Sequence, residues 1–201
     1  MKLGIMGGTF DPIHYGHLAA AEEARVQLRL ERVLFVPVKI PPHKPDEKIS
    51  APEHRLAMVE LAIASNPHFS LSQVDIDRSA PYYTVDTIAI LQKKWKVGPE
   101  DIYFIMGLDS LADILTWHRP ERLLELCHLA VMRRPGYEID FSSLEASLPE
   151  ASARILLLDM PWLDISSSDL RRRVRGGLSI RYLVPEAVEN YIYAHHLYGA
   201  T

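Results

Sequence analysis

Two histidines lie three residues apart in a glycine-rich segment near the start of the chain. Residues 7–17 read GGTFDPIHYGH and follow the apolar stretch Lys2–Met6. Glycines at the end of a strand let a ligand approach the backbone, and a helix that begins there offers unpaired N–H groups and a positive dipole end. Residues three apart on a helix share a face, so His14 and His17 can both point towards an anion. The segment therefore predicts a phosphate site.

Familiar phosphate-binding motifs do not account for this segment. Gly4, Gly7 and Gly8 do not spell G-x-G-x-x-G, and no Gly-Lys-Ser/Thr follows, so the histidines must replace a fixed lysine. Gly16 lies between the histidines and leaves a bare surface on which a flat base could pack. If only one histidine were present, the glycine pair could be an ordinary turn and the histidine a residue on the helix surface. Two histidines and three glycines at a strand-to-helix junction instead favour a nucleotide site.

A second candidate segment, DISSSDLR at residues 164–171, lies near the C-terminus. Ser166 and Asp169 have the spacing of a capping box, which predicts a helix start without any ligand. The same helix start would offer N–H groups to an anion, and Arg171 lies one turn further along the same side. The arginine run 171–173 alone would be typical of a solvated surface. Together these features predict the second half of an anion site.

The chain alternates strand and helix patterns along its whole length. Apolar runs predict strands over Lys2–Met6, Arg32–Val38, Phe69–Val74, Asp101–Met106, Leu129–Met132 and Ile155–Leu158. Helices are predicted after the first glycines and over Pro52–Ala64, Thr84–Trp95 with Thr84 as its cap, Pro120–Leu126, Ser167–Val174 and Pro185–His195. Tyr137–Ala153 reads as loop with a weak helix. This order predicts one α/β domain over residues 1–201, a doubly wound, Rossmann-like parallel sheet with helices on both faces.

Composition narrows the class of partner. The net charge of −4 and the isoelectric point near 6.1 argue against a nucleic-acid partner, which usually selects a basic protein. No apolar run approaches the roughly 18 residues that span a bilayer, and residues 1–6 are too short for a signal peptide. The single cysteine, Cys127, permits no internal disulfide, which favours a cytoplasmic location. The sequence leaves homo-oligomerisation open.

The two candidate segments resemble the signature motifs of the HIGH-type nucleotidyltransferase superfamily. HYGH at residues 14–17 matches the H-x-G-H motif, and the whole stretch 7–17 matches the longer signature. ISSSDLR at 165–171 resembles I-S-S-T-x-I-R, whose serines and arginine hold the β- and γ-phosphates of ATP in that superfamily. Ser168 stands where threonine is usual, and both residues carry a hydroxyl.

Further stretches resemble the bacterial nicotinate-nucleotide adenylyltransferases. They are PPHK at 41–44, YTVDT at 83–87, GLDSL at 107–111, WH at 117–118 and RPG at 134–136. The resemblance implies that AMP passes from ATP to nicotinate mononucleotide, with release of pyrophosphate. The nucleophile is then a substrate phosphate, so no activated serine or cysteine is needed, and the enzyme supplies alignment and positive charge.

The resemblance also implies a set of site residues. His14, His17 and Arg171 would act on the reacting phosphates. ATP would bind Gly7, Gly8, Thr9, Phe10, His14, Gly16, His17, Gly107, Asp109, Ile165, Ser166, Ser167 and Arg171. Nicotinate mononucleotide would bind Lys44, Tyr83, Thr84, Asp109, Trp117 and Arg134. No carboxylate cluster for a metal is evident, so Mg²⁺ would be carried by the ATP phosphates.

Two alternatives remain open from the sequence. Phosphopantetheine adenylyltransferase shares the phosphate-binding motifs but is usually shorter, and the stretches at 83–87 and 107–118 argue against it. A non-catalytic nucleotide sensor would need the glycines but has no use for leaving-group stabilisation by His17 and Arg171.

Overall fold

Six strands form one parallel sheet in the computed structural model, which describes residues 1–40, 49–133, 141–161 and 163–200. The strands lie in the order β3–β2–β1–β4–β5–β6. Their bounds are β1 Leu3–Gly8, β2 Arg32–Pro37, β3 Phe69–Leu71, β4 Ile102–Gly107, β5 His128–Arg133 and β6 Ile155–Asp159. The order reverses between β1 and β4, which pair in parallel, so the sheet has its switch point there.

Side-chain alternation along the strands builds a hydrophobic cluster on each face. In β1, Leu3 and Ile5 belong to one cluster and Met6 to the other. The first cluster is covered by α4 Thr84–Trp95, α5 Leu108–Ala112, α6 Pro120–Leu126, α7 Phe141–Ser147 and α8 Ala151–Arg154. The second is covered by α1 Tyr15–Leu28 and α2 Pro52–Ile63, and α9 Ser167–Arg175 and α10 Glu186–Ala194 extend its cluster beyond the sheet. The predicted doubly wound fold with helices on both faces is confirmed.

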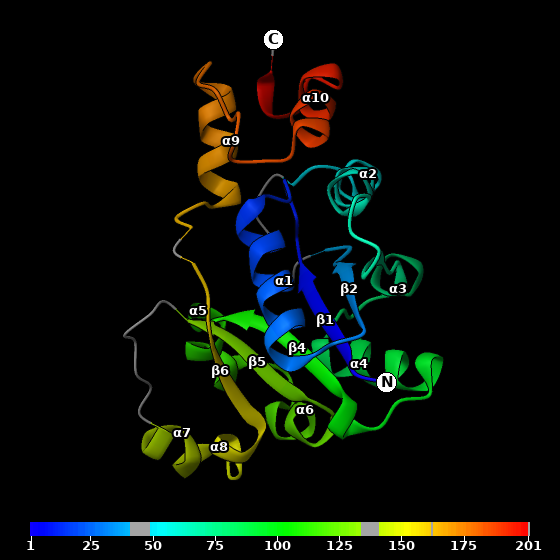
Figure 1. The fold of residues 1–201 in the computed structure, drawn as a ribbon, viewed down its shortest axis with the longest axis vertical. Coiled ribbons are helices and arrows are strands. Elements are labelled where there is room, and N and C mark those ends of the chain that lie inside the picture. The colour runs from blue at the N-terminus through cyan, green and yellow to red at the C-terminus, as the bar shows by residue number, and fades with distance from the viewer. Residues whose placement is uncertain (41–48, 134–140, 162, 201) are drawn as a thin grey trace.

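The C-terminal helices stand beyond the carboxyl ends of the strands. Figure 1 shows α1 in front of β1, with α9 and α10 at the top of the molecule. The 3₁₀ turn Leu197–Gly199 contacts both of these helices. The C-terminal part of the chain therefore reaches the loop that follows β1. No helix within the described ranges is long and apolar enough to cross a bilayer.

Several short elements differ from the sequence-based expectation. The predicted strand Phe69–Val74 ends at Leu71, and the chain then forms the four-residue helix α3, Val74–Asp77. The short helix α5 after β4 was not predicted, and the weak helix expected in 137–153 is the pair α7 and α8. The prediction that Thr84 caps α4 is wrong: Tyr83 is the N-cap, without a side-chain cap bond, and Thr84 is the first helical residue. Turns of four or five residues are too short to show a helical period.

Candidate active site

One cleft of about 760 Å³ gathers nearly all the predicted site residues. It lies at the carboxyl ends of β1 and β4, where a doubly wound sheet binds its ligands. Among the predicted residues, those that line it are Gly7, Gly8, Thr9, Phe10, His14, Gly16, His17, Thr84, Gly107, Asp109, Trp117, Ile165, Ser166, Ser167 and Arg171. Tyr83 lines an adjoining pocket. Lys44 and Arg134 lie outside the described residues.

The loop after β1 is folded around a buried phenylalanine. Phe10 adopts a positive φ of 51° and is 2% exposed. A Cβ at Gly8 would lie 3.0 Å from the Phe10 ring, so only glycine lets the ring lie there undisturbed. The ring also meets the edge of His17, with centroids 5.1 Å apart. Gly8 thus makes room for the Phe10 ring as well as leaving backbone exposed to a ligand.

The loop is then tied to distant parts of the chain through Asp11. The buried Asp11 carboxylate accepts a hydrogen bond from the Tyr198 hydroxyl at 2.6 Å and another from the Ser50 N–H at 3.0 Å. Burial and the nearby Asp11 charge raise the pKa of Tyr198, which therefore remains a hydroxyl donor. These bonds fix the loop that carries the two histidines.

Arg55, a fully buried arginine of α2, anchors the same loop from below. Its guanidinium donates to the carbonyls of Thr9 at 2.9 Å, Val38 at 2.7 Å, Lys39 at 2.8 Å and Ser50 at 3.0 Å. Burial lowers the pKa of Arg55 from its usual value, while the Asp11 charge opposes that shift. One planar cation therefore satisfies carbonyls from two loops, the one after β1 and the one between β2 and α2.

The two histidines form a stacked pair at the start of α1. His14 is the N-cap and His17 lies in the first turn, as predicted, with ring centroids 3.8 Å apart. Burial lowers the pKa of His14 to about 4, and burial together with His14 lowers the pKa of His17 well below its usual value. Both rings are therefore neutral near pH 7, and they act as hydrogen-bonding groups rather than as fixed cations.

Contacts with the backbone determine which ring nitrogen of each histidine can form a hydrogen bond with a ligand. The His14 N–H donates to Nδ1 of His17 at 3.3 Å, so His17 carries its proton on Nε2 as a donor. Nδ1 of His14 is buried and has no hydrogen-bond partner within the described part of the chain. A Cβ at Gly16 would lie 3.0 Å from that nitrogen, so Gly16 makes room for the His14 ring. The sequence assigned Gly16 only to base packing and did not predict this role.

The second predicted segment meets the first across the cleft. Ser166 caps α9 by accepting the Asp169 N–H at 3.1 Å, while the Asp169 carboxylate pairs with Arg172 instead of closing a capping box. The Ser167 hydroxyl donates to the carbonyl of Pro12 at 2.9 Å, although 155 residues separate them. Arg171 donates to the carbonyl of Asp11 at 2.8 Å. The structure thus brings the two predicted segments into direct contact.

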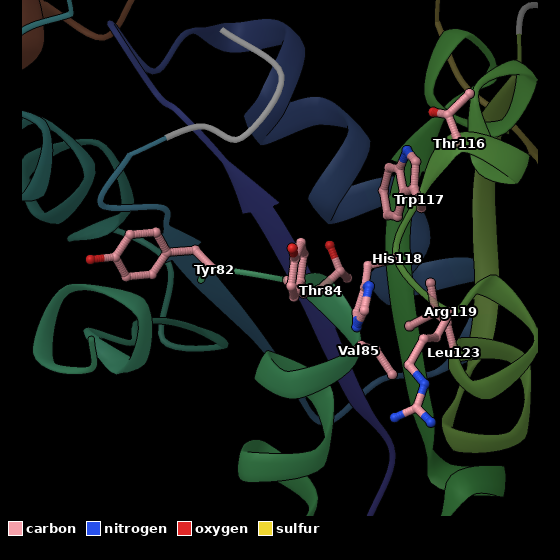
Figure 2. Close-up of a pocket in the computed structure, with 9 residues that line it drawn as sticks. Tyr82, Thr84, Val85, Thr116, Trp117, His118, Arg119 and Leu123 are labelled. Atoms are coloured by element: carbon pink, nitrogen blue, oxygen red, sulfur yellow. The ribbon is translucent and has the colours of Figure 1, made fainter. Parts of the chain in front are cut away.

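The other end of the cleft opens into a pocket of about 350 Å³ between the start of α4 and the segment after α5. Trp117 and Thr84 belong to both spaces. Figure 2 shows Thr84 on one wall, with Trp117 and His118 on the other. Trp117 meets the buried Phe104 edge-on at 6.0 Å, and the Tyr83 ring stacks on His118 at 4.0 Å with an interplanar angle of 20°. The pocket is thus flat, aromatic and bounded by a helix N-terminus.

Comparison with known proteins supports the motif-based resemblance. The cytidylyltransferase-like family model matches residues 5–173. A probable nicotinate-nucleotide adenylyltransferase of Thermomicrobium roseum is 49% identical over 197 residues, covering 98% of this chain and 91% of that protein. Another of that description, from Roseiflexus castenholzii, is 50% identical over 197 residues and covers 98% of both chains. The chain belongs to the nicotinate-nucleotide adenylyltransferases of this cytidylyltransferase-like family.

Solved structures share the fold of this adenylyltransferase chain. Nicotinic acid mononucleotide adenylyltransferase of Plasmodium falciparum, complexed with NaAD, superposes with a TM-score of 0.79 at 22% identity, covering 100% of this chain and 98% of that one. The crystal structure of a putative nicotinate-nucleotide adenylyltransferase from Vibrio parahaemolyticus superposes with a TM-score of 0.68 at 18% identity, with the same coverage. At these identities the likeness shows the Rossmann-like nucleotidyltransferase fold.

Sequence reasoning missed the residues that support this adenylyltransferase site from behind. Asp11 lay within the first motif and received no role, and Tyr198 was not singled out. Arg55 lay in a predicted helix whose apolar stripe gave no reason to expect a buried cation. Their bonds run mostly between side chains and distant backbone, which sequence spacing does not display. The ion pair between Asp75 and Arg78 could have been predicted, because two residues of opposite charge stand three positions apart.

Proposed function

We propose that the protein transfers AMP from ATP to nicotinate mononucleotide, giving nicotinate adenine dinucleotide and pyrophosphate. The observation that carries this proposal is the single cleft with two unlike ends. One end joins both phosphate motifs, and the other is an aromatic pocket with a helix start. The full-length relatives are described as enzymes of this activity.

At the phosphate end, an oxygen of the mononucleotide 5′-phosphate attacks the α-phosphorus of ATP. The bond from that phosphorus to the bridging oxygen breaks, and negative charge accumulates on the leaving pyrophosphate. His17 would donate from Nε2 to the reacting phosphates, and His14, whose Nδ1 is buried, would contact the same ligand through Nε2. Arg171, aligned by the carbonyl of Asp11, would supply positive charge to the leaving group. Alignment of two bound reactants accounts for the rest of the rate enhancement.

The serines of the second motif have separate tasks. The Ser167 hydroxyl donates within the protein, to Pro12, so its contribution to a phosphate would come from the backbone at the start of α9. Ser166 accepts from the Asp169 N–H and keeps its own hydroxyl proton to donate to the β- or γ-phosphate. The backbone of Ile165 lies beside Gly16, so it would form part of the wall of the ATP site.

Magnesium would arrive with ATP. Within the described residues no three His, Cys, Asp or Glu side chains gather where they could hold a metal ion. The cleft residues fit a Mg²⁺ that is bound mainly by phosphate oxygens and water, with its charge offsetting that of the triphosphate.

Gly107 leaves an open backbone surface at the end of β4, and the exposed Asp109 would accept the ribose hydroxyls there.

At the other end, the pyridine ring would stack on Trp117 with its carboxylate towards the start of α4. The Asp86 and Thr87 N–H groups already bond the carbonyl of Tyr83. The donors that remain for a carboxylate are therefore the N–H groups of Thr84 and Val85, at the positive end of the helix dipole. We assign the mononucleotide phosphate to Lys44 and Arg134 from the motif resemblance.

The test is release of pyrophosphate by the purified protein with ATP and Mg²⁺. Three acceptors are compared: nicotinate mononucleotide, nicotinamide mononucleotide and 4′-phosphopantetheine. We expect rapid release with the first and at least about 10²-fold lower kcat/KM with the others, because their chemistry leaves donors in the pocket unpaired. Rapid release with 4′-phosphopantetheine, or none with any acceptor, would overturn the proposal.

A further inference from the structure

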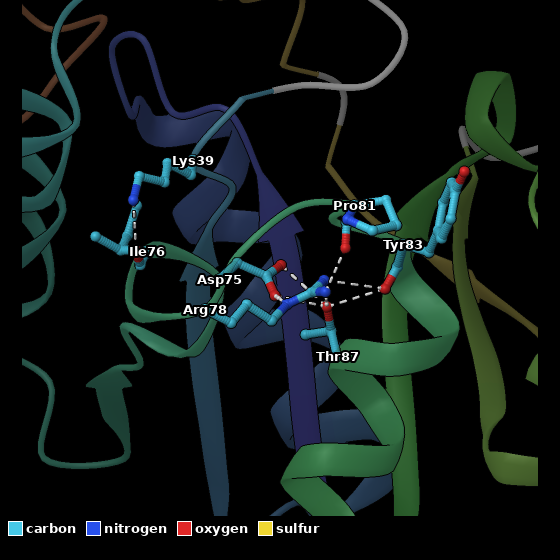
Figure 3. Close-up of polar contacts among 7 residues, drawn as sticks. All are labelled: Lys39, Asp75, Ile76, Arg78, Pro81, Tyr83 and Thr87. Atoms are coloured by element: carbon cyan, nitrogen blue, oxygen red, sulfur yellow. Dashed lines mark hydrogen bonds and ion pairs between the residues drawn. The ribbon is translucent and has the colours of Figure 1, made fainter.

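The segment that forms one wall of the aromatic pocket has no regular secondary structure. Residues 78–83 join α3 to α4 and carry Tyr82 and Tyr83 into the pocket. The Arg78 guanidinium donates to the carbonyl of Pro81 and, at 3.3 Å, to the carbonyl of Tyr83 (Figure 3). One side chain therefore holds the backbone of this segment at two points.

Arg78 is itself fixed by two buried neighbours. Its Nε donates to the Asp75 carboxylate at 2.7 Å, and its Nη2 lies 3.2 Å from the Thr87 hydroxyl. That hydroxyl has one proton, which goes to Asp75 at 2.8 Å, so it accepts from Arg78. Asp75 is 5% and Thr87 4% exposed, which shields the ion pair from solvent. Lys39 holds the far side of α3 by donating to the carbonyl of Ile76 at 3.2 Å.

The carbonyl that Arg78 reaches is the one at which α4 begins. Tyr83 is the N-cap, and its oxygen accepts the N–H groups of Asp86 at 3.1 Å and Thr87 at 3.2 Å. Its ring stacks on His118 across the pocket. Arg78 therefore controls the direction of the first N–H groups of α4 and the position of the ring that joins the two walls.

We propose that Arg78, locked by Asp75 and Thr87, is a positioning residue that sets the affinity and the acid-over-amide selectivity of the acceptor pocket. It touches no substrate and acts through the backbone at Tyr83 and Thr84. This inference rests on the proposed function, which assigns the pyridine carboxylate to that helix start.

A purely structural role makes a different prediction. The body of α4 is held to the sheet by the buried side chains of Val85, Ile88 and Leu91, none of which depends on Arg78. Loss of Arg78 should therefore leave α4 packed while its first turn and residues 78–83 lose alignment. A structural role would lower stability and change the kinetics of both substrates alike, whereas a positioning role affects the mononucleotide.

The experiment compares Arg78→Met and Thr87→Val with two matched controls. Arg122→Met removes an exposed arginine that also pairs with a carboxylate three residues away, and Thr87→Ser keeps the hydroxyl. Steady-state kinetics are measured with each substrate varied. For Arg78→Met we expect the KM for nicotinate mononucleotide to rise about 10–100-fold, with the KM for ATP within about 2-fold of wild type. Thr87→Val should raise the acceptor KM about 10-fold, and both controls should match wild type.

Hydrogen exchange at the Asp86 and Thr87 N–H groups, which bond the Tyr83 carbonyl, is measured without substrate and gives a readout that does not depend on activity. Faster exchange in Arg78→Met and Thr87→Val, together with the raised acceptor KM, supports the inference. Unchanged exchange, or equal changes in the KM for both substrates, would overturn it. If Arg78→Met fails to fold, the Thr87→Val and Thr87→Ser pair decides. If the wild-type protein did not use nicotinate mononucleotide, the proposed function would be overturned. Faster exchange in the variants would in that case still establish that Arg78 holds the backbone of residues 78–83 in place.

Discussion

The phosphate end and the acceptor end of the cleft are built in different ways. The phosphate end is made from two continuous motifs, each at a junction that leads into a helix, and their backbones meet through Ser167 and Arg171. The acceptor end is made from a short irregular segment whose backbone is held by the side chains of Asp75, Arg78 and Thr87. The first region is thus built from two motifs that distant side chains such as Tyr198 and Arg171 hold together, and a local buried side-chain cluster holds the second.

This difference indicates where the specificity for the acceptor can change while the transfer of AMP is retained. Every nucleoside triphosphate donor in this reaction type presents the same triphosphate, so the phosphate end can keep one fixed geometry. The acceptor varies among enzymes that use similar phosphate motifs, and a segment held by three side chains can be altered by few substitutions. We expect mutations at the two ends to separate into effects on kcat and effects on the acceptor KM.

The largest effects should come from the phosphate end. We expect His17→Ala and Arg171→Ala to lower kcat about 10²–10³-fold, by analogy with the loss of one preorganised donor to a developing charge. Each variant also loses one hydrogen bond within the protein, so a modest drop in melting temperature is expected and kcat is measured well below it. Arg175→Ala, one turn further along α9 and exposed, is the matched control. Wild-type turnover by either variant at saturating ATP would remove its assigned role.

A smaller effect should come from the tie between the C-terminus and the phosphate loop. Tyr198→Phe deletes the hydroxyl that donates to Asp11, whose carbonyl aligns Arg171. We expect kcat to fall about 3–10-fold and the free energy of unfolding to fall by about 1–3 kcal/mol, because a buried carboxylate loses one donor. The control is Tyr182→Phe, whose side chain is 84% exposed. Unchanged kcat with lowered stability would show that the tie is structural only.

The phosphate end should also make stability depend on pH. The pKa of His14 falls from 6.5 to about 4 on folding, so the unfolded chain binds more protons between these values. Its contribution to stability is present above pH 6.5 and is lost as the pH falls towards 4, at most about 3 kcal/mol. Urea titrations from pH 7 to pH 4 should show a shallower loss for His14→Gln than for wild type. Parallel curves would contradict the buried neutral imidazole.

The sequence predicted most of the sheet and most of the phosphate end for a physical reason. Strands such as Arg32–Pro37 are buried on both faces and read as apolar runs, and each phosphate motif is a local strand-to-helix or loop-to-helix signal. The supporting bonds were not predictable. Tyr198 and Asp11 are 187 residues apart, and the four carbonyls that Arg55 bonds lie in two loops rather than at a helical spacing. Such partners are brought together only by the completed fold.

For the proposed acceptor end, the sequence indicated candidate residues but not the bonds that hold them. The motif at 83–87 indicated Tyr83 and Thr84, yet the cap lies one residue earlier than expected. Tyr83 is the cap because its carbonyl accepts the first N–H groups of α4, and Arg78 donates to the same oxygen. Sequence spacing shows which side chains share a helix face, but it does not show which carbonyl an arginine will reach.

The most direct test of the account is the acceptor preference of the wild-type protein. Values of kcat/KM are measured for nicotinate and nicotinamide mononucleotide at fixed, saturating ATP. A helix start offers donors only, so the carboxylate is matched, whereas the amide sets its own N–H₂ against the N–H groups of Thr84 and Val85. We predict a preference of at least about 10²-fold for the nicotinate form. Equal values would contradict the assignment of the pyridine substituent to the start of α4.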